Sequence, residues 1–207
     1  MKKGIARLLL KLKAVSLRPN KPYKFASGIL SPIYCDNRLV MSYPKERALV
    51  VDSFIKIINQ KKIKFDVLAG TATAGVPWAA FLALRLDKPM IYVRKASKEH
   101  GKENLIEGEL RKGKRVLLIE DLVSTGGSSL NAVKSIREAG GKIAICLAIF
   151  SYQFKKAELD FKENNINLIT LSDFETLVDA AIKEKYINKK DKKILSKWNK
   201  EPEKWRK

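Results

Sequence analysis

The sequence predicts an α/β protein with a parallel five-stranded sheet flanked by helices. Short apolar runs of strand length alternate with longer stretches in which apolar residues recur at helical spacing. Glycines stand in several of the loops between these segments. Because parallel strands need crossover connections, this alternation predicts a sheet covered by helices on both faces.

Five apolar runs are expected to form the strands, at residues 65–69, 90–93, 116–119, 143–150 and 166–171. Helices are expected at residues 44–59, 77–86, 127–139 and 172–186. Pro77 opens the second helix, and Gly140 with Gly141 ends the third. Ser172 and Glu175 have the spacing of a capping box, which predicts where the last helix begins.

The two ends of the chain carry most of its positive charge. The 207 residues include 42 Lys or Arg and 22 Asp or Glu, which gives a formal net charge of +20. Residues 1–24 contribute +8 and residues 183–207 contribute +7, so the body carries only +5. A large positive net charge is typical of proteins that bind nucleic acids. The nearly balanced body and the 45% hydrophobic content instead favour a globular domain with basic ends.

The cysteines and the N-terminal segment indicate a soluble protein of the reducing cytosol. Cys35 and Cys146 belong to no Cys-x-x-Cys or Cys/His pattern, so no disulfide framework or zinc site is expected. Ile5, Leu8, Leu9 and Leu12 mark one face of a helix. We expect this helix to dock on the core, with a membrane-surface helix as the alternative. No stretch approaches the roughly 18 apolar residues that a membrane span needs.

The most informative segment is residues 116–129. Four apolar residues lead directly into Glu120 and Asp121, and a turn rich in hydroxyls and glycines follows at residues 124–128. Backbone N–H groups at such a turn, beside a helix N-terminus, suit a phosphate monoester. The two carboxylates would repel that phosphate, so we expect them to hold ribose hydroxyls or a hydrated divalent cation. Solvated acids with Ser124 as an ordinary helix cap would be the simpler interpretation, but it explains the whole segment less well.

Two other loops follow expected strands at the same edge. Small residues in the loop at 69–77 would let backbone amides approach a diphosphate, although a strand-to-helix turn explains its glycines equally well. It is no P-loop, because Val76 and Pro77 stand where Lys and Ser or Thr are required. Residues 94–104 form a polar run with the single histidine of the chain, too long for a simple connection. A solvated charged loop is the alternative for this run.

These segments resemble one enzyme family. Residues 116–129 resemble the ribose-5-phosphate and diphosphate signature of the type I phosphoribosyltransferases. Residues 94–101 resemble the mobile catalytic loop of the orotate phosphoribosyltransferases, and residues 25–38 resemble that family's base-proximal segment. The chain has Ala26, Ala74 and Tyr152 at positions that are often basic in the family.

The resemblance implies a single domain over residues 1–207 with the type I phosphoribosyltransferase fold. A small N-terminal hood would cover about residues 1–42, an α/β core about 43–186, and a basic helix or tail about 187–207. The implied reaction transfers ribose 5-phosphate from 5-phosphoribosyl 1-diphosphate to orotate in the de novo synthesis of UMP. Its products are orotidine 5′-phosphate and diphosphate.

The resemblance also implies the site residues. The catalytic groups would be Arg94, Lys98, His100 and Asp121. Substrate would be bound by Arg94, Lys95, Lys98, His100, Glu120, Asp121, Leu122, Val123, Ser124, Thr125, Gly126, Gly127 and Ser128. Mg²⁺ is expected through substrate and water, without a protein cage. A homodimer is expected, in which residues 94–108 act on the neighbouring subunit, with no specific nucleic acid or membrane partner.

Two other functions stay open. A phosphoribosyltransferase acting on a purine base would share the phosphate signature, although residues 25–38 and the 94–101 run favour orotate. A nucleic-acid-binding regulator on the same fold could sense phosphoribosyl diphosphate and use the basic ends. The charged 94–101 run favours catalysis, because a sensor need not stabilise a leaving group.

Overall fold

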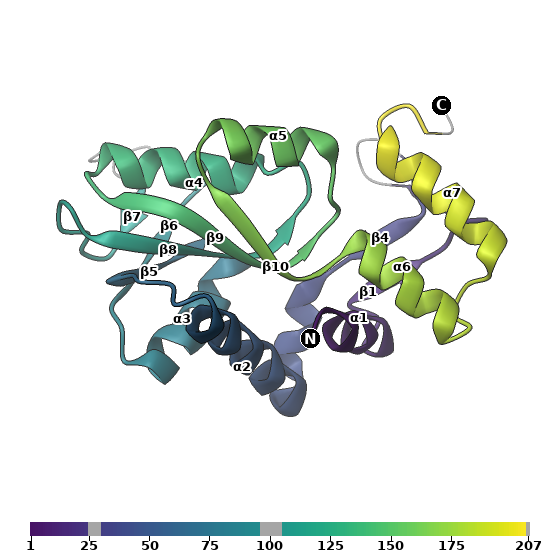
Figure 1. Ribbon diagram of the computed structural model, residues 1–207, viewed down its shortest axis with the longest axis horizontal. Coiled ribbons are helices and arrows are strands. Elements are labelled where there is room, and N and C mark those ends of the chain that lie inside the picture. The colour runs from purple at the N-terminus through teal and green to yellow at the C-terminus, as the bar shows by residue number, and fades with distance from the viewer. Residues whose placement is uncertain (25–29, 96–104, 206–207) are drawn as a thin grey trace.

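The computed structural model describes residues 1–24, 30–95 and 105–205 and has a mostly parallel sheet at its centre (Figure 1). In the described residues the sheet has six strands, in the order β10-β9-β8-β5-β6-β7. They are β5 (Val67–Thr71), β6 (Met90–Val93), β7 (Ile106–Glu107), β8 (Arg115–Val123), β9 (Lys142–Ser151) and β10 (Asn167–Asp173). The α/β class is confirmed. The expected count of five strands misses β7, a two-residue edge strand that runs antiparallel to β6 and is too short to leave an apolar pattern.

Helices cover both faces of the sheet. α2 (Pro44–Gln60) and α3 (Gly75–Leu86) lie on one face, and α4 (Gly127–Glu138) and α5 (Lys155–Glu163) lie on the other (Figure 1). The sequence does not predict α5, because only Ala157 and Phe161 of its nine residues are buried. A single apolar pair at i, i+4 is too weak a periodic signal.

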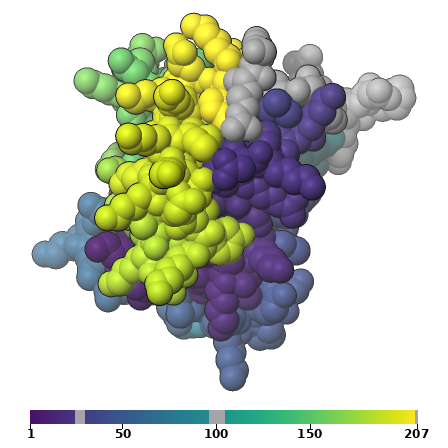
Figure 2. All heavy atoms as spheres, turned by 90° about the vertical axis from the view of Figure 1, so that its right-hand side faces the viewer, coloured from purple at the N-terminus to yellow at the C-terminus, as the bar shows by residue number. Residues whose placement is uncertain are grey.

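The two ends of the chain form a lobe beside the sheet. α1 (Lys2–Lys11) packs against α6 (Phe174–Lys183), and α7 (Lys189–Lys200) follows α6. Figure 2 shows the purple N-terminal and yellow C-terminal segments side by side on this face. Two short antiparallel pairs, β1 (Val15–Leu17) with β4 (Ile33–Cys35) and β2 (Tyr23–Lys24) with β3 (Leu30–Ser31), complete the lobe. A 3₁₀ helix, η1 (Asn37–Ser42), then leads to α2.

The apolar stripe and the basic C-terminal segment are both helical. Ile5, Leu8 and Leu9 are buried as the periodicity predicts. The lysine-rich segment forms α7, which begins with a capping box between Asn188 and Asp191. None of the helices in the described part of the chain is long and apolar enough to cross a membrane.

Several expected element boundaries are wrong. α3 begins at Gly75, so Pro77 lies within its first turn and does not open the helix. β8 continues through Glu120 and Asp121 to Val123, so the acid pair lies within the strand rather than after it. The capping box of Ser172 and Glu175 is absent: α6 begins after Asp173, whose carboxylate accepts a hydrogen bond from the Thr176 N–H. Ser172 is instead a buried residue of β10, since the strand extends further than its apolar run indicates.

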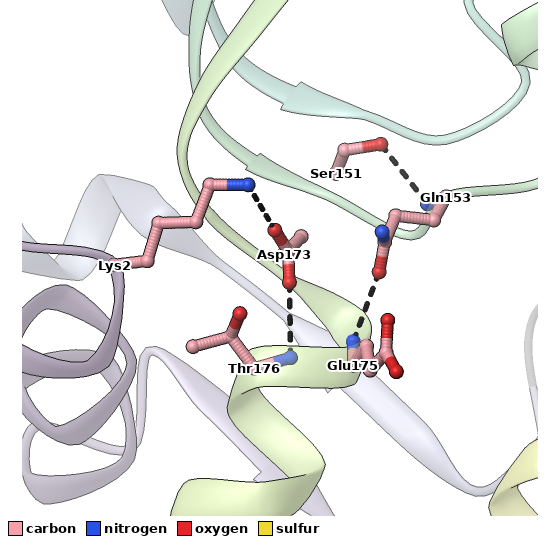
Figure 3. Close-up of polar contacts among 6 residues, drawn as sticks. All are labelled: Lys2, Ser151, Gln153, Asp173, Glu175 and Thr176. Atoms are coloured by element: carbon pink, nitrogen blue, oxygen red, sulfur yellow. Dashed lines mark hydrogen bonds and ion pairs between the residues drawn. The ribbon is translucent and has the colours of Figure 1, made fainter.

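Asp173 also joins the two ends of the chain (Figure 3). One carboxylate oxygen accepts from Lys2 Nζ at 2.6 Å and the other accepts from the Thr176 N–H at 2.9 Å. Burial raises the pKa of Asp173, but the hydrogen bonds from Lys2 and Thr176 outweigh this and hold the pKa below its ordinary value. The charged carboxylate therefore stabilises the contact between α1 and α6.

We expect Asp173→Ala to lower the free energy of unfolding by about 1–2 kcal/mol, because it removes a helix N-cap and an ion pair. Asp173→Asn keeps a good cap and removes only the charge. Because the pKa of Asp173 is lower in the folded state, the advantage of wild type over Asp173→Asn is fully present above about pH 4 and shrinks as the pH falls. Urea unfolding at about pH 7 and about pH 3 measures this difference. A difference that does not change with pH would contradict a charged role.

Candidate functional site

The carboxyl ends of β5, β6 and β8 meet at one edge of the sheet, and two adjoining hollows open there. The acidic hollow, of about 300 Å³, is lined by Cys35, Asp36, Arg38, Thr71, Ala72, Thr73, Ala74, Lys95, Glu120, Asp121, Leu122 and Ser128. The basic hollow, of about 390 Å³, is lined by Thr71, Ala72, Val93, Arg94, Lys95, Leu105, Ser128, Asn131, Ala132, Lys134, Ser135 and Glu138. Loops from distant parts of the sequence therefore converge on a single concave region, as the parallel sheet predicts.

The acid pair of β8 lies at the floor of the acidic hollow. Glu120 is buried, and its two carboxylate oxygens accept hydrogen bonds from Ser129 Oγ at 2.9 Å and from the Asp121 N–H at 3.1 Å. Burial raises the pKa of Glu120, and the neighbouring charge of Asp121 raises it further. Burial likewise raises the pKa of Asp121. Two carboxyl groups that are costly to ionise together favour a ligand that brings hydroxyl donors or positive charge.

The N-terminal segment supplies site residues that the expected set omits. Asn37 is buried in η1, and its Nδ2 donates to the backbone carbonyl of Asp121 at 2.7 Å. Arg38 forms a bidentate pair with Asp36, at 2.7 and 2.9 Å. Cys35, Asp36 and Arg38 all line the acidic hollow. The sequence signal that could have identified these three residues is the resemblance of residues 25–38 to a base-proximal segment.

The loop after β5 depends on two glycines. A Cβ on Gly75 would stand 2.5 Å from the Ile119 carbonyl oxygen in β8, and one on Gly70 would stand 2.7 Å from Val76 Cα. These glycines therefore let the first turn of α3 pack directly on β8, beside Glu120. Between them lies Thr71, whose buried Oγ1 has no hydrogen-bond partner in the described residues. Because Thr71 lines both hollows, a ligand oxygen there would satisfy its hydroxyl.

The turn at residues 124–128 connects β8 to α4. Gly126 is the N-cap of α4, with φ +85°, and it provides no side-chain cap. Ser124 is therefore not the helix cap. The first N–H groups of a helix have no partner within it, so this turn has the free donors that a phosphate requires. Gly126 is further constrained by Phe161 of α5, whose ring would lie 2.8 Å from a Cβ at this position.

Six of the thirteen expected site residues line the two hollows: Arg94, Lys95, Glu120, Asp121, Leu122 and Ser128. Lys95 and Ser128 line both hollows, and Arg94 lines the basic one, where it pairs with Glu107 at 3.4 Å. The expected residues that line neither hollow are Val123, at the buried end of β8, and Ser124, Thr125, Gly126 and Gly127, in the turn. Lys98 and His100 lie outside the described residues.

Comparison with known proteins identifies the family. Residues 43–185 match the family model described as "Phosphoribosyl transferase domain". The chain is 52% identical over 201 residues to a protein of Coxiella burnetii named orotate phosphoribosyltransferase, covering 97% of this chain and 96% of that one. The chain belongs to the orotate phosphoribosyltransferase family.

Solved structures of the phosphoribosyltransferase family share its fold. The crystal structure of orotate phosphoribosyltransferase from Aeropyrum pernix matches 89% of this chain and 99% of that one, with 28% identity and a TM-score of 0.76. The Mycobacterium tuberculosis orotate phosphoribosyltransferase in complex with 5-phospho-α-D-ribosyl 1-diphosphate matches 85% of this chain and 98% of that one, with 22% identity and a TM-score of 0.67. The type I phosphoribosyltransferase fold is thereby confirmed.

We expect Gly75→Ala to lower the free energy of unfolding by about 1–3 kcal/mol, because the new Cβ forces α3 away from β8. Gly4→Ala is the matched control: Gly4 lies in α1 with nothing within 4 Å of a Cβ. At that position alanine should raise stability by about 0.5–1 kcal/mol through its better helix propensity. Chemical denaturation of both variants measures the two effects, and equal responses would refute the close-packing explanation.

Proposed function

We propose that this chain transfers ribose 5-phosphate from 5-phosphoribosyl 1-diphosphate to orotate, releasing diphosphate and forming orotidine 5′-phosphate for pyrimidine synthesis. The observation that carries the proposal is the convergence of three features at one sheet edge. These are the acid pair of β8, the open turn at 124–128 and the glycine loop at 70–75. Each suits one part of phosphoribosyl diphosphate, and the near full-length similarity to a protein named orotate phosphoribosyltransferase supports the acceptor.

The sugar phosphate lies across the end of β8. The 5′-phosphate accepts hydrogen bonds from the backbone N–H groups of residues 124–128 and from the hydroxyls of this turn. Glu120 and Asp121 then face the ribose, where their oxygens accept from its vicinal hydroxyls. Their negative charge also favours the positive charge that the sugar gains as diphosphate leaves.

The diphosphate lies over the loop at 70–75. Thr71 Oγ1 supplies a hydrogen bond, and the side chains of Lys95 and Arg94 supply positive charge from the end of β6. Lys98 and His100 add further cations as the 94–108 loop closes. Charge on the diphosphate grows as the C–O bond breaks, so cations held in place stabilise the transition state more than the ground state.

Magnesium fits the donor set at this site. Asp121 and the Thr71 hydroxyl are oxygen donors of the kind Mg²⁺ prefers, and no cluster of three acidic, His or Cys ligands occurs in the described residues. We infer that Asp121, waters and the diphosphate hold the ion. When bound, Mg²⁺ neutralises the diphosphate and makes it a better leaving group.

Orotate lies beside the N-terminal segment. Cys35, Asp36 and Arg38 line the acidic hollow together with Glu120 and Asp121, so a base here would stand next to the ribose. The free thiols of Cys35 and Cys146 suit the cytosol, where we place the enzyme. We further propose a homodimer in which the 94–108 loop closes over the neighbouring subunit's site.

An acceptor assay tests the proposed function. Orotate absorbance should fall when the protein, phosphoribosyl diphosphate and Mg²⁺ are all present, and hypoxanthine or uracil should neither replace orotate nor compete with it. This follows because the acceptor must fit the hollow beside Arg38. Turnover of hypoxanthine without orotate would instead indicate a purine phosphoribosyltransferase. Absence of any transfer, together with sequence-selective DNA binding, would favour the regulator.

Mixed dimers test the sharing of the loop between subunits. Lys98→Ala and Asp121→Asn should each lower kcat about 100-fold, the scale on which one preorganised electrostatic contact acts. When the two variants are mixed, one site of each mixed dimer contains neither substitution if the loop acts in trans. Activity should therefore recover on mixing, as initial rates would show.

Lys88→Ala and Asp87→Asn are the matched controls, because both residues are exposed at the end of α3. Each should retain full activity. Dimers proven by mass spectrometry to be mixed, yet inactive, would refute sharing. Full activity of Asp121→Asn would show that the acid pair is structural.

A further inference from the structure

The main chain of Tyr152 connects the C-terminal helix to the end of β8. Its N–H donates to the Val123 carbonyl at 3.0 Å, and its own carbonyl accepts from Asn199 Nδ2 at 2.5 Å. Val123 is the last residue of β8, directly before the turn at 124–128. The main chain of Tyr152 is thus hydrogen-bonded both to the residue before the turn at 124–128 and to α7.

Aromatic packing reinforces the α7 side of this connection. Trp198, which is 3% exposed, contacts the Tyr152 ring edge-on, with centroids 5.4 Å apart and an angle of 90°. It also contacts Phe154 at 5.3 Å and Phe174 at 5.7 Å. At this often basic family position, the chain therefore has a buried ring that packs on its own C-terminal helix.

A second set of hydrogen bonds holds the same loop from α6 (Figure 3). Gln153 has φ +56°, and its Oε1 accepts from the Glu175 N–H at 3.0 Å, in the first turn of α6. Its own N–H donates to Ser151 Oγ at 3.0 Å. These bonds fix the residues on either side of Tyr152, and Asn199 fixes the carbonyl of Tyr152 itself.

We propose that Asn199 is a positioning residue for the phosphate turn at 124–128. Asn199 touches no substrate. Its side chain donates to the Tyr152 carbonyl, and the Tyr152 N–H donates to the Val123 carbonyl. Through these two bonds Asn199 fixes the direction in which the turn leaves β8. The phosphate-binding role of that turn rests on the proposed function, whereas the mechanical coupling does not.

Two variants of Asn199 separate the hydrogen bond from packing. Asn199→Ala removes the side chain, and Asn199→Asp keeps its shape but removes the donor. Both should speed amide hydrogen exchange in a peptide spanning residues 119–130 and weaken binding of ribose 5-phosphate. We expect a change of about five-fold in each, the scale of one lost neutral hydrogen bond. Mass spectrometry and calorimetry on the full-length protein measure them.

Two control variants distinguish positioning from general destabilisation. Lys193→Ala changes an exposed residue of the same helix, and Ile57→Val loosens the buried face of α2. Neither should change exchange in residues 119–130 or the Kd for ribose 5-phosphate, even where Tm falls as far as in the Asn199 variants. A lowered Tm in the Asn199 variants with both readouts unchanged would overturn the proposal, as would an equal effect of Ile57→Val. If the Asn199 variants exchange faster in residues 119–130 but the wild-type protein binds no ribose 5-phosphate, the mechanical coupling of Asn199 to the turn is supported and the proposed function is contradicted.

Discussion

The parallel pairing of β5 with β8 is the constraint on which the site depends. Its register sets Gly70 opposite Ile119, so the loop after β5 emerges beside the acid pair of β8. The contact closes only because Gly75 has no Cβ, which allows the first turn of α3 to lie on the Ile119 carbonyl. The loop after β5 and the acid pair of β8 therefore line one hollow.

Burial of the acid pair gives the site its chemical character. Glu120 accepts a hydrogen bond from Ser129 of α4, so the helix that follows the turn at 124–128 also fixes this carboxylate. Ionising two adjacent buried carboxyls is costly, and a substrate that brings hydroxyls and a divalent cation offsets that cost. Thr71 and Lys95 line both hollows, so a cation from the end of β6 lies close to the acid pair of β8.

Local patterns predicted the sheet and the main loops, whereas long-range contacts were beyond them. The segment at 116–129 contains its strand, its acids and its turn in one stretch, so sequence alone indicated the chemistry. The ion pair of Lys2 with Asp173 and the hydrogen bond of Asn37 to the Asp121 carbonyl could not be predicted, because these partners are set by how distant elements pack. The basic C-terminal segment likewise reads as solvated lysines, yet α7 buries Trp198 against the loop after β9. Much of the +20 charge therefore lies on the outer faces of two packed helices.

A crystal structure of the protein with ribose 5-phosphate tests the central claim most directly. We expect the phosphate on the backbone N–H groups of residues 124–128 and the sugar hydroxyls facing Glu120 and Asp121. A larger hollow, of about 760 Å³, lies between α5 and the C-terminal segment and is lined by four lysines, Lys155, Lys197, Lys200 and Lys204. Phosphate bound among those lysines, with the turn at 124–128 empty, would show that the turn is not the phosphate site.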